Sequence, residues 1–186
     1  MKKFEEKTLN TKEIYNGKII RLQVDEVELP DGKISKREIV KHQGAVAIIP
    51  VTDEGKIIMV EQFRKPLEKS IIEIPAGKLE AGESPDVTAI RELEEETGYT
   101  TKRENLVFVD SFYTSPGFAD EIMYIYFTDK LEKLEEPVEV DDDEFLELVE
   151  MNLEEAFEAM KEQRIHDAKT NYAMMYLKAS GRLSNA

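Results

Sequence analysis

The stretch "GKLEAGESPDVTAIRELEEETGY", residues 77–99, combines the start and stop signals of a helix with a concentration of acidic residues. Ser84 is a favourable helix N-cap, Pro85 is tolerated in a first turn, and Gly98 favours the left-handed conformation that ends a helix. We therefore predict a helix that begins near Pro85, stops at Gly98 and carries glutamate at positions 92, 94, 95 and 96.

A helical wheel separates most of these acids from the apolar residues. At about 100° per residue, one face carries Glu92, Glu95 and Glu96, and the opposite face carries Val87, Ile90 and Leu93. Glu94 falls within the apolar sector. Carboxylates at this spacing repel one another, and a bound divalent cation reverses the sign of that interaction. The alternative is a solvated helix with ordinary ion pairs along its surface.

Arg91 has two candidate partners among these acids. It precedes Glu95 by four residues, which is the spacing of an ion pair on a helix. We also expect it to pair with Glu83 in the preceding loop. Such pairing would hold the loop against the helix, which is an orienting role.

Composition limits the classes of ligand. The chain has 186 residues and a formal net charge of -15, and it contains no cysteine and two histidines. Its size suits one main domain, and its charge repels nucleic acid and anionic membrane. Disulfides and thiolate metal sites are excluded, so oxygen ligands and a hard cation such as magnesium are favoured. With no apolar leader and no run of eighteen apolar residues, we expect a soluble, cytoplasmic protein.

The pattern of strands and helices predicts an α+β fold. Residues 1–42 alternate polar and apolar residues on both sides of the turn "PDGK", which favours a small antiparallel subdomain. In residues 43–186, the buried strands "GAVAIIPV" and "KIIMVEQF" precede the acidic helix, the strands "NLVFVDSFY", "EIMYIYFT" and "FLELVEM" follow it, and two helices close the chain. This order suggests an α/β/α sandwich on a mixed sheet.

The acidic stretch resembles the Nudix box. That motif is glycine, five residues, glutamate, seven residues, and then Arg-Glu-aliphatic-any-Glu-Glu-any-Gly-aliphatic. The matching positions are Gly77, Glu83, Arg91, Glu92, Leu93, Glu95, Glu96 and Gly98. Tyr99 is the single departure, at a packing position where an aliphatic residue is usual.

The resemblance implies a metal-dependent hydrolase that acts on a nucleoside diphosphate linked to another group. It implies Glu92, Glu96 and the carbonyl of Ala76 as metal ligands, with Glu95 as a ligand or a supporting group. Mg²⁺ suits such oxygen ligands, and Mn²⁺ is the expected substitute. Two or more such ions neutralise a pyrophosphate and generate a nucleophile near neutral pH.

Other stretches resemble the ADP-ribose pyrophosphatases of this family. They are "EQFRKP", "EIPAGKLE", "YTSPGFADE" with Pro116, and "IHDAKTNYA". The likeness implies hydrolysis of ADP-ribose to AMP and ribose 5-phosphate by a homodimer that exchanges its N-terminal strands. The alternatives are another nucleoside diphosphate sugar or nucleotide as substrate, or a sensor that binds ADP-ribose without cleaving it.

The same likeness implies roles for individual residues. Arg64 would contact a phosphate or the terminal ribose, and Glu121 the ribose hydroxyls, whereas Arg37 is a candidate for adenine or its phosphate and equally a plain hairpin charge. The expected catalytic set is Glu144 as base, with Glu95, Arg91 and Glu83. Asp143 and Asp141 are rivals of Glu144.

Overall fold

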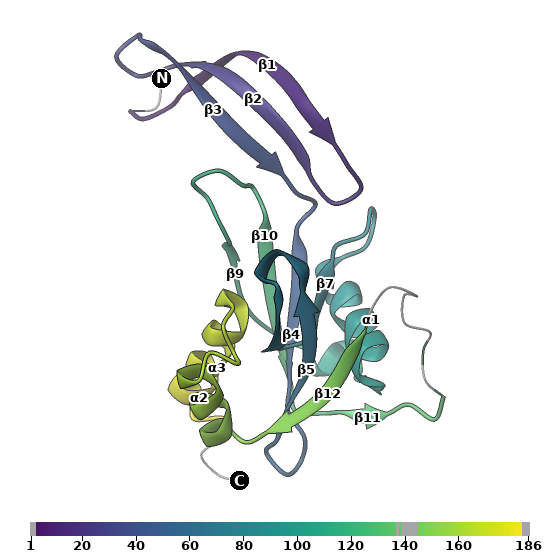
Figure 1. The fold of residues 1–186 in the computed structure, drawn as a ribbon. Coiled ribbons are helices and arrows are strands. Elements are labelled where there is room, and N and C mark those ends of the chain that lie inside the picture. The colour runs from purple at the N-terminus through teal and green to yellow at the C-terminus, as the bar shows by residue number, and fades with distance from the viewer. Residues whose placement is uncertain (1–2, 137, 139–144, 184–186) are drawn as a thin grey trace. The chain divides into compact units, whose positions relative to one another are not determined.

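The structure is a computed structural model that describes residues 3–136, 138 and 145–183. The chain forms two compact units (Figure 1). The first contains residues 1–44 and 112–122, and the second contains residues 45–111 and 123–186. Each unit is described separately below.

The first unit is built on a three-stranded antiparallel sheet, β1-β2-β3. Its strands are β1 (Lys7–Asn16), β2 (Arg21–Glu28) and β3 (Ile34–Lys41). The predicted turn joins β2 to β3, and Gly32 has a φ of 84°, which an L side chain rarely adopts. Asp25 is buried in this sheet and accepts hydrogen bonds from Thr11 and Gln23. The predicted N-terminal antiparallel sheet is therefore confirmed.

The second unit is organised around β4 (Ala45–Pro50), which is buried along its whole length. β4 pairs in parallel with β10 (Ile122–Thr128) and antiparallel with β7 (Ala76–Lys78). With β9 (Val107–Tyr113), these strands form the sheet β7-β4-β10-β9. One parallel and one antiparallel neighbour make this sheet mixed, as the sequence predicts.

A second sheet, β12-β5-β6, contains the other apolar strand of the sequence. β5 (Ile57–Arg64) lies between β12 (Leu146–Met151) and β6 (Lys69–Glu73), antiparallel to both. The remaining elements are α1 (Pro85–Thr97), α2 (Leu153–Lys161), α3 (Ala168–Ser180), the short strands β8 (Tyr99–Thr100) and β11 (Glu132–Lys133), and 3₁₀ turns at Lys65–Leu67 and Arg103–Asn105. No helix in the described ranges is both long and apolar enough to cross a membrane.

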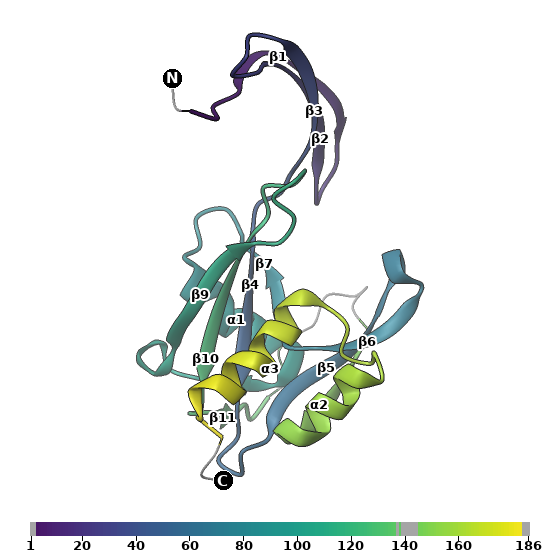
Figure 2. The same ribbon diagram turned by 90° about the vertical axis from the view of Figure 1, so that its left-hand side faces the viewer.

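Within the second unit, helices cover both faces of the β4 sheet. α1 packs against β4 and β7, and Figure 2 shows α3 on the opposite face. The expected α/β/α layering in an α+β fold is confirmed.

The wheel of α1 needs one correction. Val87, expected on the apolar face with Leu93, has 42% of its surface exposed. The buried side of α1 instead runs through Ala89, Glu92, Leu93 and Glu96, because the helix presents two of its glutamates to the sheet. The acidic face is thus partly an interior face.

Candidate active site

The helix caps fix the position of the acidic residues. Ser84 is the N-cap of α1, in extended conformation, although its hydroxyl makes no capping hydrogen bond. Gly98 ends the helix at a φ of 70°, and its N–H donates to the carbonyl of Glu94. The predicted start and end of the helix are both confirmed, and they set which side chains point back to the β7 loop.

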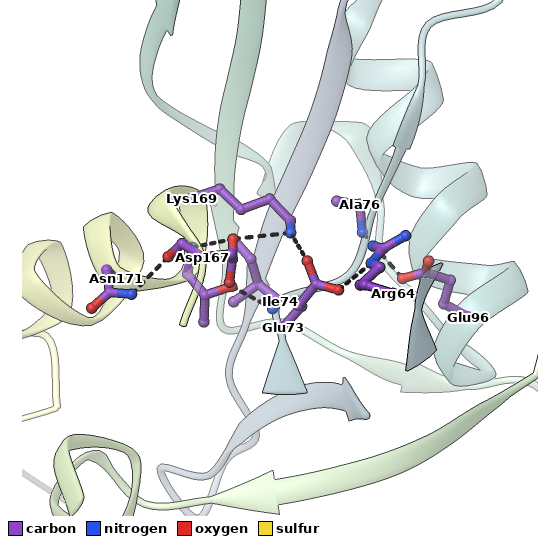
Figure 3. Close-up of polar contacts among 9 residues, drawn as sticks. Arg64, Glu73, Ile74, Ala76, Glu96, Asp167, Lys169 and Asn171 are labelled. Atoms are coloured by element: carbon purple, nitrogen blue, oxygen red, sulfur yellow. Dashed lines mark hydrogen bonds and ion pairs between the residues drawn. The ribbon is translucent and has the colours of Figure 1, made fainter. Parts of the chain in front are cut away.

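Two glutamates of α1 are packed against the start of that loop. A Cβ added to Gly77 would overlap the carboxylate of Glu92, so glycine is the residue that lets this carboxylate lie against the backbone. Glu96 accepts a hydrogen bond of 3.1 Å from the backbone N–H of Ala76. Both glutamates are buried, and Figure 3 draws the contact of Glu96.

Arg91 joins three of the carboxylates into what we call the Arg91 cluster: Arg91, Glu83, Glu92 and Glu95. Its Nη1 lies 2.7 Å from Glu95 and 2.9 Å from Glu92, and its Nη2 lies 3.4 Å from Glu83. The predicted pairing with Glu95 and Glu83 is therefore confirmed. Burial opposes the charge of Arg91, but the neighbouring carboxylates, Glu92 first, outweigh it and raise the pKa of the guanidinium.

The donor set of this region fits a hard divalent cation. One guanidinium faces three carboxylates, which leaves an excess of two negative charges, and Glu96 with the Ala76 carbonyl adds further oxygen donors. In the described residues, no group of three or more acidic or histidine side chains is arranged so that it could hold a metal ion as it stands. Arg91 lies between Glu92 and Glu95, so a bound cation would share these carboxylates with the guanidinium.

Arg64, at the end of β5, is held by a residue that the sequence did not single out. Its Nε donates to Glu73 at 2.5 Å, and the Nζ of Lys169 donates to the other oxygen of the same carboxylate. Asp167 pairs with Lys169 at 3.1 Å. We call Arg64, Glu73, Asp167 and Lys169 the Glu73 network (Figure 3). Its key contact joins residues 96 apart in the sequence, so no local pattern indicated it.

The two substrate candidates of the first unit make contacts within that unit. Arg37 forms two hydrogen bonds to Glu6, at 2.8 and 2.6 Å, and this carboxylate raises the pKa of the guanidinium. Glu121 accepts a hydrogen bond from Thr114 at 2.5 Å and lies 3.6 Å from His42. Both side chains are thus oriented by neighbours.

The predicted base cannot be placed in the same way. Glu144 and its rivals Asp143 and Asp141 lie outside the described residues.

Comparison with family models identifies the class of the protein. Residues 41–172 match the NUDIX domain, and residues 6–40 match the nucleoside diphosphate sugar hydrolase N-terminal domain. The chain belongs to the Nudix family, as the box at residues 77–99 predicted. Enzymes of this family generally use divalent metal ions.

Individual relatives give a more specific comparison than the family match. The chain is 60% identical to an ADP-ribose pyrophosphatase of Bacillus subtilis (strain 168), with 95% of each chain covered. It is 57% identical to a protein of Bacillus methanolicus named methanol dehydrogenase activator, and this alignment covers 99% of the present chain and 98% of the relative. A crystal structure of an ADP compounds hydrolase has the same fold, with a TM-score of 0.82, 22% sequence identity, and 96% and 97% of the two chains covered.

Proposed function

We propose that this chain hydrolyses the pyrophosphate of ADP-ribose to AMP and ribose 5-phosphate. The observation that carries the proposal is the buried pair Glu92 and Glu96, held against the backbone of Gly77 and Ala76 in a Nudix box that keeps all of its glutamates. The 60% identity to the Bacillus subtilis ADP-ribose pyrophosphatase supports the choice of substrate.

The reaction adds one water across one P–O bond. The water oxygen bonds to one phosphorus, the bond from that phosphorus to the bridging oxygen breaks, and the bridging oxygen stays with the other phosphate. Two phosphomonoesters result. The site must therefore hold an anionic diphosphate and remove a proton from water.

We propose Mg²⁺ as the cation, with Mn²⁺ as a substitute, held by Glu92, Glu96 and the Ala76 carbonyl. A cation bound there supplies charge neutralisation and acidifies bound water. Arg91 keeps Glu95 and Glu83 in fixed positions around the site, and Glu95 serves as a ligand or a supporting group. This assignment is supported by the Arg91 ion pairs.

The remaining assignments concern the base and the substrate. We propose Glu144 as the group that takes the proton from water. Arg64 contacts a phosphate. Its hydrogen bond to Glu73 uses only Nε, so four further N–H donors of the guanidinium remain for that contact. Glu121 accepts from ribose hydroxyls, and Arg37 contacts the adenosine end.

We also propose that the first unit makes the protein a homodimer. Its strand β1 is exposed along its whole length, with Leu9, Ile14 and Tyr15 among the exposed apolar side chains. Such a strand suits a partner that covers it. Removal of residues 1–42 should abolish both dimerisation and activity, and an active monomeric truncation would overturn this assignment.

A substrate panel tests the proposed reaction. We expect kcat/KM with Mg²⁺ to be highest for ADP-ribose, compared with other sugar nucleotides and oxidised nucleoside triphosphates. Equal or greater efficiency on any competitor would refute the assignment. Hydrolysis in ¹⁸O-labelled water then identifies the phosphorus that is attacked, from the product that carries the label.

The relative from Bacillus methanolicus favours a second candidate, the activation of a dehydrogenase. This function predicts that adding the chain to a methanol dehydrogenase raises the rate of alcohol oxidation. If a variant without hydrolytic activity, such as Glu96→Gln, activates equally well, activation works through binding. If the variant does not, hydrolysis is the means of activation.

A further inference from the structure

The Glu73 network places a carboxylate in the interior of the second unit. The side chain of Glu73 is 4% exposed, and that of Lys169 is 10% exposed. A buried carboxylate must be paired, because its desolvation costs several kcal/mol in the absence of partners. Lys169 is the more buried of its two cationic partners, since the side chain of Arg64 is 38% exposed.

The hydrogen bonds define what each partner does. Arg64 binds one oxygen of Glu73 and Lys169 binds the other, so the orientation of the carboxylate depends on both cations (Figure 3). With Lys169 in place, Glu73 is held from the α3 side. The guanidinium of Arg64, at the end of β5, then has an acceptor in a fixed position at the end of β6.

The first turn of α3 anchors Ile74 as well as Glu73. The hydroxyl of Thr170 accepts a hydrogen bond from the backbone N–H of Ile74, at 3.1 Å. Asp167 caps α3 by accepting from the N–H of Thr170 and also pairs with Lys169. Ile74 follows Glu73 directly, so consecutive residues of the chain are anchored to consecutive residues of one helix turn.

We propose that Lys169 is a positioning residue for substrate binding, which acts through Glu73 on the guanidinium of Arg64. The inference deepens the proposed function and rests on it where it takes Arg64 as a phosphate contact. Lys169 is then needed for the affinity of the enzyme for its substrate, although it belongs to the C-terminal helix and not to the Nudix box.

The test compares two lysines that both form ion pairs. Lys169→Met removes the buried partner of Glu73, and Lys161→Met removes an exposed pair with Glu158 on α2 as a matched control. We expect Lys169→Met to raise KM for ADP-ribose about tenfold with a much smaller change in kcat. Lys169→Arg should restore most of the loss, and Lys161→Met should behave as the wild type.

A double-mutant cycle separates positioning from a general loss of structure. If Lys169 acts through Arg64, then Lys169→Met adds no further increase in KM once Arg64→Ala is present. If the two effects multiply, the proposal is wrong. Circular dichroism checks folding, and if Lys169→Met does not fold, Lys169→Gln replaces it in the same cycle.

A readout without substrate keeps the two proposals distinguishable. The Nε–Hε signal of Arg64 in a ¹⁵N–¹H NMR spectrum reports its bond to Glu73 directly. We expect this signal to shift or broaden in Lys169→Met and to stay unchanged in Lys161→Met. An unchanged signal in Lys169→Met overturns the positioning role. If the wild type does not hydrolyse ADP-ribose, the proposed function fails, and this signal alone decides the positioning role.

Discussion

The Arg91 cluster and the Glu73 network both contain an arginine paired with carboxylates, but their charges differ. In the Arg91 cluster, one cation faces three carboxylates. In the Glu73 network, two cations face two carboxylates, and the charges balance. The Glu73 network is thus neutral overall, whereas the Arg91 cluster keeps an excess of two negative charges that a bound divalent cation would offset. The difference matches the roles that we propose for the two groups: cation binding near the Arg91 cluster, and positioning of Arg64 by the rest of the Glu73 network.

The largest expected effect is on turnover at the acidic helix. Glu96→Gln should lower kcat about a thousandfold, because our proposal makes Glu96 a metal ligand and a bound cation contributes several kcal/mol of transition-state stabilisation. The fold should survive, since the amide oxygen of glutamine can still accept from Ala76. Steady-state kinetics and thermal unfolding measure the two effects. A kcat within tenfold of the wild-type value would show that Glu96 is not a metal ligand.

The contrast between the two groups is sharpest in stability. Glu73→Gln leaves two cations around a buried neutral side chain and should destabilise the fold by about 3 kcal/mol, at the low end for a broken buried pair. Glu95→Gln removes one carboxylate from a cluster that has excess negative charge, and we expect the free energy of unfolding to change by less than about 1 kcal/mol. Urea unfolding of both variants measures the difference. Equal losses would abolish the distinction between the groups.

Gly77→Ala tests the close approach of Glu92 to the loop. The added methyl group would overlap the carboxylate, so Glu92 must move, and we expect kcat to fall about a hundredfold. Gly117→Ala is the matched control, since an added Cβ there meets no heavy atom within 4 Å. If both variants keep full activity, the position of Glu92 does not matter for turnover.

The cation itself should also stabilise the fold. With Mg²⁺ at a hundred times its dissociation constant, the free energy of unfolding should rise by about 2.7 kcal/mol. We expect this gain to vanish with EDTA and in Glu92→Gln, and to persist in Lys169→Met, because the Glu73 network is outside the cation site. A calorimetric scan with and without Mg²⁺ measures it. A gain that survives Glu92→Gln would place the cation elsewhere.

The sequence was most informative where signals are local. The apolar runs of β4 and β5, the helix signals at Ser84, Pro85 and Gly98, and the pairing of Arg91 with Glu95 all depend on residues near one another in the chain. The fold class followed from the order of such elements, and the acidic part of the candidate site followed from the helical wheel together with the resemblance to the Nudix box. Periodicity and capping are properties of a few turns, so one sequence is enough to read them.

Contacts between distant segments could not be predicted in this way. β6 and β7 were missed because Pro75 interrupts a short apolar stretch, "KSIIEIPAGK", whose partners lie elsewhere. Val87 was misplaced because the wheel assumes that apolar side chains face the core, whereas α1 turns Glu92 and Glu96 inward. The link from Glu73 to Lys169 depends on tertiary packing, which leaves no periodic signal.

The lengths of chain closed by these contacts bear on how the molecule is made. The hydrogen bond from Ala76 to Glu96 spans 20 residues, whereas Lys169 reaches back 96 residues to Glu73. Synthesis proceeds from the N-terminus, and closing a longer loop of chain costs more conformational entropy. On a nascent chain, all residues of the Ala76–Glu96 contact are therefore synthesised before α3, and the helix that holds Glu73 beside Arg64 is made after both of these residues.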